Sequence, residues 1–348
     1  MTTPIATVTR GEFLRGRIMD IQRQLGELQT QVATGRKSVD LSGYGSQTRT
    51  LLNLSNVKQT TDIYLQTITQ TQARMDLTQK VLTRIYDLAN QMRSSIATVN
   101  NPEAQADGPS DISLRTLALN AIREIVDLLN QAPDGRYLFS GFSAGTVPMI
   151  EPGDVSQPAS PLGQVAALGQ VPNFPLDNTT ASGDTLYDAI ANFFGNSANY
   201  YQGDTDPNSR VTVRVDTKLD IAYGVRGDNS AIRSILQAMY AVASNTLSTS
   251  SQGGWNRLVT RAANDLDSGI GLLAQTQGAL GQQQIVLKDL VSRHNTFSTA
   301  LQNQIADIEN VDPADAIQRI SILQTQLQAS YQIISQLRDL SLVNYLTN

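Results

Sequence analysis

Residues 57–99 have the sequence VKQTTDIYLQTITQTQARMDLTQKVLTRIYDLANQMRSSIATV. Alternating steps of four and three residues separate its mainly apolar and threonine positions, which are Val57, Thr61, Tyr64, Ile68, Thr71, Met75, Thr78, Leu82, Ile85, Ala89, Met92, Ile96 and Val99. Because neither Gly nor Pro interrupts the pattern, it predicts one helix on the order of 65 Å long, at about 1.5 Å per residue. Such a helix needs an extended helical partner, and its threonines favour a multi-helix bundle over a two-stranded zipper.

The same spacing recurs near both ends of the chain. The N-terminal positions are Leu14, Ile18, Ile21, Leu25, Leu28 and Val32. The C-terminal positions are Ile320, Leu323, Leu327, Ile334 and Leu337, in a run that also includes Ala316 and Ser330. Exposed on a monomer, these two sets would form a larger apolar stripe than soluble monomers normally show. We therefore expect them to be an assembly seam, loose in the free chain and ordered when copies bundle.

Gly, Pro and capping residues predict where the terminal helices end. Gly35 predicts the end of the first helix, and residues 41–46 are expected to form a loop. Asp312 and Pro313 have the residue types of a helix N-cap and first position, so they predict the start of the last helix.

The interior of the chain combines further helices with short strands. Helices are predicted at 112–130 (with Ser110 or Asp111 as N-cap), 185–194, 229–244 and 255–308. Residues 137–139 are predicted to be a short strand, and alternating apolar residues at 211–215 and 219–225 predict a hairpin. Residues 141–175 are rich in Pro and Gly and show no helical period.

These patterns predict a mainly α fold with a β-rich middle domain. The N- and C-terminal helices are expected to pair as an elongated antiparallel coiled-coil bundle. The expected domains are a terminal coiled-coil helix at 1–40, the N-terminal half of a long-helix core at 41–140, a variable β-rich middle domain at 141–227, the C-terminal half of the core at 228–309, and a second terminal coiled-coil helix at 310–348.

Composition excludes several classes of function. Charged residues make up 16% of the chain, below the roughly 25% that is typical, and the net charge is −5. This balance argues against nucleic-acid binding, which rewards basic surfaces, and suits side-by-side packing of identical copies. The absence of cysteine excludes disulfides, thiolate catalysis and cysteine metal sites. No stretch is apolar over the length of a membrane span, and the first ten residues do not resemble a cleaved secretory signal.

The sequence offers no catalytic, cofactor-binding or metal site, so we do not expect an enzyme. His294 is the single histidine and lies on a helical seam position, where a satisfied interhelical histidine is far commoner than a ligand. The close carboxylate pairs Asp265/Asp267 and Asp312/Asp315 are expected to be a solvated face and a helix start. Neither a phosphate-binding glycine loop nor a nucleophile elbow is present.

Several motifs, taken in order along the chain, resemble the bacterial flagellin family over essentially the whole length. QVATGRK at 31–37 resembles the end of the family's first helix, and DGRYLFSG at 134–141 resembles the motif before its variable domain. YYQG at 200–203, VRVD at 213–216 and YGVR at 223–226 resemble the β domain of the family's hook–filament junction branch. LQASY at 327–331 and LSLVNYL at 340–346 resemble that branch's C-terminal signature. The family-motif residues are Thr34, Gly35, Arg36, Gly135, Arg136, Tyr137, Phe139, Gly141, Leu340, Leu342, Asn344, Tyr345 and Leu346.

The resemblance implies a flagellin-like fold and a structural role in the bacterial flagellum, most similar to the hook-associated protein 3 type. It implies a homo-oligomer ring with hook-associated protein 1 and flagellin as neighbours. It also implies type III export without a cleaved signal peptide, an export chaperone at the C-terminal region, and an extracellular location. The start Met-Thr-Thr-Pro and the extra Thr347 and Asn348 depart from the family pattern.

Three alternatives remain open from the sequence. A filament-forming flagellin would share the terminal helices, although the ending LSLVNYL favours the junction branch. A bundle-type scaffold protein with a β-rich recognition domain would have stable ends in the monomer. An enzyme is the least favoured, because no site supports one.

Overall fold

The structure is a computed structural model that describes residues 5–99, 111–170, 176–206, 210–245 and 251–346. It is mainly helical and divides into two compact units. Unit 1 comprises Met1–Asp62 and Asn295–Asn348, and unit 2 comprises Ile63–His294. The boundary between the units falls inside two long helices, α2 (Thr48–Val99) and α7 (Gln252–Glu309).

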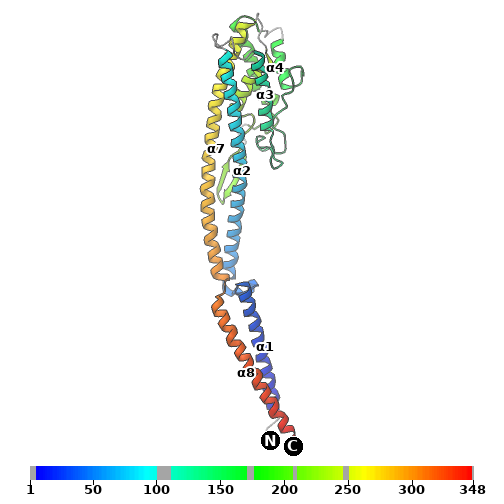
Figure 1. Ribbon diagram of the computed structural model, residues 1–348, viewed down its shortest axis with the longest axis vertical. Helices are drawn as coiled ribbons and strands as arrows, with labels where there is room; N and C mark the ends of the chain where they lie inside the picture. The colour runs from blue at the N-terminus through cyan, green and yellow to red at the C-terminus, as the bar shows by residue number, and fades with distance from the viewer. Residues whose placement is uncertain (1–4, 100–110, 171–175, 207–209, 246–250, 347–348) are drawn as a thin grey trace. The chain divides into compact units, whose positions relative to one another are not determined.

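Unit 1 contains the two terminal helices, α1 (Ile5–Thr34) and α8 (Pro313–Leu346), which run side by side (Figure 1). The predicted ends are confirmed. The backbone of Gly35 has a φ of +71°, a left-handed conformation that glycine adopts without steric cost, and α1 stops there. At α8, the Asp312 side chain accepts a hydrogen bond from the Ala314 N–H at 2.9 Å, as an N-cap does. Residues 41–47 form a 3₁₀ segment, η1 (Leu41–Gln47), kinked at Gly45.

The long seam of α2 is buried in unit 2, but its predicted first position is wrong. From Ile68 to Ile96 every predicted position is buried. In unit 1, Val57 is 44% exposed, and the less exposed line of α2 runs through Leu51, Leu54, Lys58 and Thr61 instead. The four-three steps therefore continue backward from Thr61 through a lysine, which an apolar pattern does not detect.

Two polar pairs fix the register of α2 against α7 in unit 2. Gln277 donates a hydrogen bond to the Thr83 hydroxyl at 3.1 Å, and Gln284 donates one to the Asp76 carboxylate at 2.7 Å. Because a shift of one turn would leave these groups unpaired, they specify the alignment of two otherwise uniform helices.

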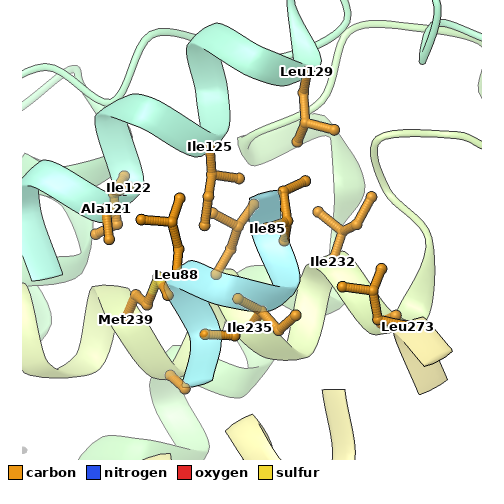
Figure 2. Packing of buried hydrophobic residues seen from close by; sticks show 14 of the residues in the cluster. Ile85, Leu88, Ala121, Ile122, Ile125, Leu129, Ile232, Ile235, Met239 and Leu273 are labelled. Carbon is orange, nitrogen blue, oxygen red and sulfur yellow. The ribbon is translucent and has the colours of Figure 1, made fainter. Parts of the chain in front are cut away.

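The core of unit 2 forms where α3 (Asp111–Leu129) and α6 (Ser230–Ser244) pack around α2. Figure 2 shows Ile85 and Leu88 of α2 among side chains of α3 and α6, with Leu273 of α7 at the edge. Asn229 caps α6, accepting a hydrogen bond from the Ala231 N–H.

The middle segment differs from the prediction. Within the described part of residues 141–227 lie two α-helices, α4 (Pro161–Gln170) and α5 (Thr180–Gly195), the single turn η2 (Ser197–Asn199) and one two-stranded hairpin. The β-rich character is therefore not confirmed. The prediction of a helix at 185–194 is confirmed, and α5 begins one turn earlier than expected.

The predicted hairpin is present but shorter. Strands β1 (Thr212–Asp216) and β2 (Leu219–Ala222) are antiparallel, with Val213 opposite Ile221. The predicted strand at 137–139 is wrong. Its backbone N–H groups bond to the Gln131 and Ala144 carbonyls, and its Phe139 carbonyl accepts from Gly227, so no neighbouring strand pairs with it. The possible N-cap Ser110 lies outside the described residues.

Candidate assembly surface

The terminal seam residues face each other within one chain. On α1, Ile18 is 8% exposed, and Leu14, Ile21, Leu25, Leu28 and Val32 are half-buried. On α8, Ala316 is buried, and Ile320, Leu323, Leu327, Ser330 and Ile334 are half-buried. Leu337 belongs to α8, but its side chain lies outside the described part of the chain. The two predicted seams are thus the facing sides of α1 and α8, and Gln22 donates a hydrogen bond across them to the Tyr331 hydroxyl at 3.0 Å.

A second apolar set, which lies outside the predicted seam positions, points away from the α1–α8 contact. Ile322 and Ile333 of α8 are 50% and 47% exposed, and Phe13 and Met19 of α1 are more exposed still. The spacing could have shown the α8 positions, because 322, 326, 329 and 333 repeat the four-three steps on another face. Two half-apolar faces on one helix indicate that α8 can contact more than one neighbour.

The outer surfaces of the two helices differ in charge. From Ile320 to Gln336, α8 carries no charged residue, and its exposed positions are mainly Gln, Ser and Thr. On α1, Arg23 pairs with Asp20 and Glu27 of its own helix, and the Arg17 guanidinium lies 6.0 Å from the Phe13 ring centroid. An uncharged face lets identical copies approach without like-charge repulsion, whereas the charged face of α1 is a typical solvated surface.

The family-motif residues of 134–141 fold into a turn that holds unit 2 together. Gly135 and Gly141 both have positive φ angles, +74° and +67°. Phe139 is fully buried, and its carbonyl accepts a hydrogen bond from the Gly227 N–H at 2.9 Å. The Ser140 carbonyl accepts one from the Asp204 N–H, also at 2.9 Å. The motif therefore has a structural role, and its two glycines allow the left-handed backbone conformation that the turn requires.

The Tyr200–Gly203 motif lies against this turn. The hydroxyl of Tyr201 donates to the Phe139 carbonyl at 3.3 Å, and Tyr201 forms an isolated antiparallel bridge with Met149. Two motifs that are far apart in sequence thus meet in one place. Burial, with the nearby Asp228 carboxylate, raises the pKa of Tyr201 to about 12. Burial also raises the pKa of Tyr187, Tyr200 and Tyr240.

We expect unit 2 to lose stability in alkali because of these tyrosines. A tyrosine whose pKa is higher in the folded than in the unfolded protein contributes its full stabilisation below the unfolded pKa, near 10. That contribution is lost as the pH rises through the folded pKa, which is about 12 for Tyr201. Circular dichroism against pH should show unfolding that starts above pH 10 in the wild type, and Tyr201→Phe should move the midpoint upward. Tyr331→Phe, at an exposed position, is the control, and an unchanged midpoint in Tyr201→Phe would contradict the assignment.

Most of the remaining family-motif positions lie in unit 1, and two lie in unit 2. Thr34, Gly35 and Arg36 form the end of α1 and the connector after it. Leu340, Leu342, Asn344, Tyr345 and Leu346 belong to the last turns of α8, and their side chains lie outside the described residues. Arg136 and Tyr137 lie in the turn of unit 2.

The predicted close carboxylates have structural partners. Asp265 accepts hydrogen bonds from the Tyr187 hydroxyl and the Gln237 amide, at 2.6 and 2.7 Å, so it is not part of a purely solvated face. Asp267 pairs with Arg93, and Asp315 pairs with Arg319. Each carboxylate of the two pairs thus has a partner in the structure, and Asp312 caps a helix.

His294 joins α7 to the hairpin in unit 2. Its Nε2 lies 2.9 Å from the Val215 carbonyl, and its ring stacks on Tyr64 at 5.8 Å between centroids. The histidine is satisfied, as the sequence predicts, but its hydrogen-bond partner is a strand carbonyl and the Tyr64 contact alone is between helices. Within the ranges that the structure covers, no group of three or more His, Asp or Glu is placed to hold a metal ion.

A surface pocket of about 370 Å³ lies in unit 2 between residues 222–230 and α7. Its Arg226 is already bound to Asp228 and to the Asp206 carbonyl, so it is not available to a ligand. Among the described helices, none combines the length and apolar character needed to cross a membrane.

One comparison with known proteins matches the region that contains α8. Residues 264–346, most of α7 and all of α8, match the family model described as the bacterial flagellin C-terminal helical region. A search of curated proteins finds no match.

Two solved structures have a similar fold. One is a provisionally assigned flagellar hook-associated protein from Vibrio parahaemolyticus, at 14% identity and a TM-score of 0.52, with 77% of this chain and 100% of that chain covered. The other is FlgL from Xanthomonas campestris, at 11% identity and a TM-score of 0.50, with 73% of this chain and 99% of that chain covered.

Proposed function

We propose that this chain belongs to the bacterial flagellin family and serves as the hook–filament junction subunit of the flagellum, the hook-associated protein 3 or FlgL type. One observation carries the proposal: the flagellin C-terminal match at 264–346 includes the whole of α8, the helix that pairs with α1. The fold shared with a hook-associated protein and with FlgL supports the junction role over the filament role. The role is structural, and no enzymatic activity is part of it.

Assembly proceeds through the terminal helices. In each copy α1 and α8 pack as an antiparallel coiled-coil pair along the predicted seam, including Leu25 and Leu327. Neighbouring copies then contact the second apolar set, such as Ile322 and Ile333, along the uncharged face of α8. Because like charges are absent there, identical helices can lie side by side in a ring.

The rest of the chain is divided as its sequence suggests. Residues 1–40 and 310–348 form the terminal assembly domain, 41–140 and 228–309 the long-helix core, and 141–227 the middle domain. The neighbours in the flagellum are hook-associated protein 1 on one side and flagellin on the other. Export through the flagellar type III apparatus, without a cleaved signal, places the protein outside the cell. An export chaperone covers the apolar faces of the C-terminal region before assembly.

The filament-forming alternative is tested by growth from seeds. Purified chain, incubated alone with short filament fragments, should add at most a short cap and no long filament, since a junction subunit ends at a defined ring. Flagellin of the same bacterium is the positive control. Long filaments grown from this chain alone would overturn the junction role and favour a filament subunit.

A further inference from the structure

Two connectors of unit 1 lie against each other. One follows α1 and includes Gly35, Arg36 and Lys37; the other joins α7 to α8. Arg36 and Asn310 form an isolated antiparallel bridge. The Lys37 N–H donates to the Glu309 carbonyl at 2.7 Å, and the Val311 N–H donates to the Gly35 carbonyl at 3.0 Å. We call this pairing of residues 35–37 with 309–311 the connector bridge.

Lys37 adds a second kind of contact to the connector bridge. Its ammonium donates hydrogen bonds to the Asp307 and Ile308 carbonyls, at 3.1 and 2.9 Å. These carbonyls belong to the last turn of α7, where a helix has no internal donors left for its oxygens. A cation there also interacts favourably with the negative end of the helix dipole. One side chain of the α1 connector thus caps the C-terminus of α7.

The neighbouring residues hold this arrangement from both sides. Gln31 of α1 donates a hydrogen bond to the Lys37 carbonyl at 2.8 Å, and the Arg36 guanidinium lies 3.5 Å from the Glu309 carboxylate. Gly35 turns the chain toward the other connector with its positive φ. A Cβ at Gly35 would have nothing within 4 Å, so the glycine is required by the backbone angle and not by crowding.

We infer that Lys37 is a positioning residue, which, with the connector bridge, sets the register of α1 against α8 so that the two helices act as one arm. The half-buried seam alone fixes register weakly, because its four-three apolar pattern repeats along both helices. The connector bridge anchors one end of the pair at a single alignment, and the Gln22–Tyr331 hydrogen bond agrees with it further along. The inference concerns the free chain and stands independently of the proposed function.

Engineered cysteines test the register directly, because the chain has no cysteine of its own. Arg36 and Asn310 lie between the two backbone hydrogen bonds of the connector bridge, an arrangement with Cα atoms about 4.5 Å apart, within the range for a disulfide. Arg36→Cys with Asn310→Cys should oxidise within the chain at least roughly tenfold faster than the offset pair Arg36→Cys with Ala314→Cys. Loose connectors would close both loops at similar rates, since closure depends weakly on loop length. Similar rates would overturn the inference.

The role of Lys37 is then tested in the faster pair. Lys37→Met keeps much of the stem and removes the charge, so it should slow oxidation by about threefold to fivefold. Lys37→Arg, which can still reach the carbonyls, should restore the rate, and Lys288→Met at an exposed position of α7 should leave it unchanged. If Lys37→Met oxidised as fast as the parent pair, Lys37 would have no positioning role. A loss that Lys37→Arg does not restore would also refute the cation-capping account.

Discussion

Leu25→Asp should abolish assembly and leave unit 2 folded. Leu25 is half-buried on the side of α1 that faces α8, where a carboxylate would lose hydration without gaining a cationic partner. The cost is on the order of a few kcal/mol, and every copy in a ring would bear it. Cells with the variant as their only copy should be non-motile, with hooks that carry no filament.

Gln24→Asp is the matched control for this change. It adds the same charge one residue away, at an exposed position of α1, and should support normal filaments. The single tryptophan, Trp255, is buried in unit 2, so its fluorescence reports the unfolding of that unit. Its denaturation curve should be the same in wild type, Leu25→Asp and Gln24→Asp. Normal filaments with Leu25→Asp would show that the α1–α8 seam does not support assembly.

Ile85→Ala should destabilise unit 2 by about 2–5 kcal/mol, the usual cost of a cavity left by a fully buried isoleucine. Ile85 is 0% exposed and lies among side chains of α3 and α6 (Figure 2). Urea unfolding followed by Trp255 fluorescence should therefore show a lower midpoint with an unchanged slope.

Ile63→Ala makes the same change on the same helix at a position that is 53% exposed. Its midpoint should stay within about 0.5 kcal/mol of the wild type, because little apolar area is lost there. Equal losses in the two variants would mean that the α2–α3–α6 core does not carry the stability of unit 2.

Much of the helical architecture could be predicted from local chemistry. Gly35 ends α1 through a backbone angle that glycine favours, and Asp312 with Pro313 starts α8 through a cap that those residue types form. The seam from Ile68 to Ile96 is buried as predicted. Its burial could be predicted because the apolar period and the length of the helix are both visible in one segment of sequence. These features depend on residues close together in the chain.

The features that the sequence did not predict all depend on partners that are distant in the chain. Residues 137–139 are apolar and aromatic like a strand, but their hydrogen-bond partners come from three separate segments. Helix α4 contains Gly163 and Gly169 and has weak intrinsic propensity; burial of Leu162 and Val165 in the core of unit 2 stabilises it. The connector bridge joins residues some 270 positions apart, so no single segment could reveal it.

The candidate assembly surface was only half predictable. The apolar spacing located the seam and predicted that the terminal helices pair. It also led to the expectation that the seam stays loose in the free chain, whereas α1 and α8 cover each other's seams within one chain. That pairing leaves the second apolar set, including Ile322 and Ile333, as the surface available to a neighbour.

The most direct test of the junction role is the flagellin found in the medium of a strain that lacks this gene. If the chain joins hook to filament, the deletion strain should build hooks, carry no filaments and release its flagellin as soluble protein, and the wild-type gene should restore filaments. Filaments of normal length on the deletion strain, with no flagellin in the medium, would contradict the account.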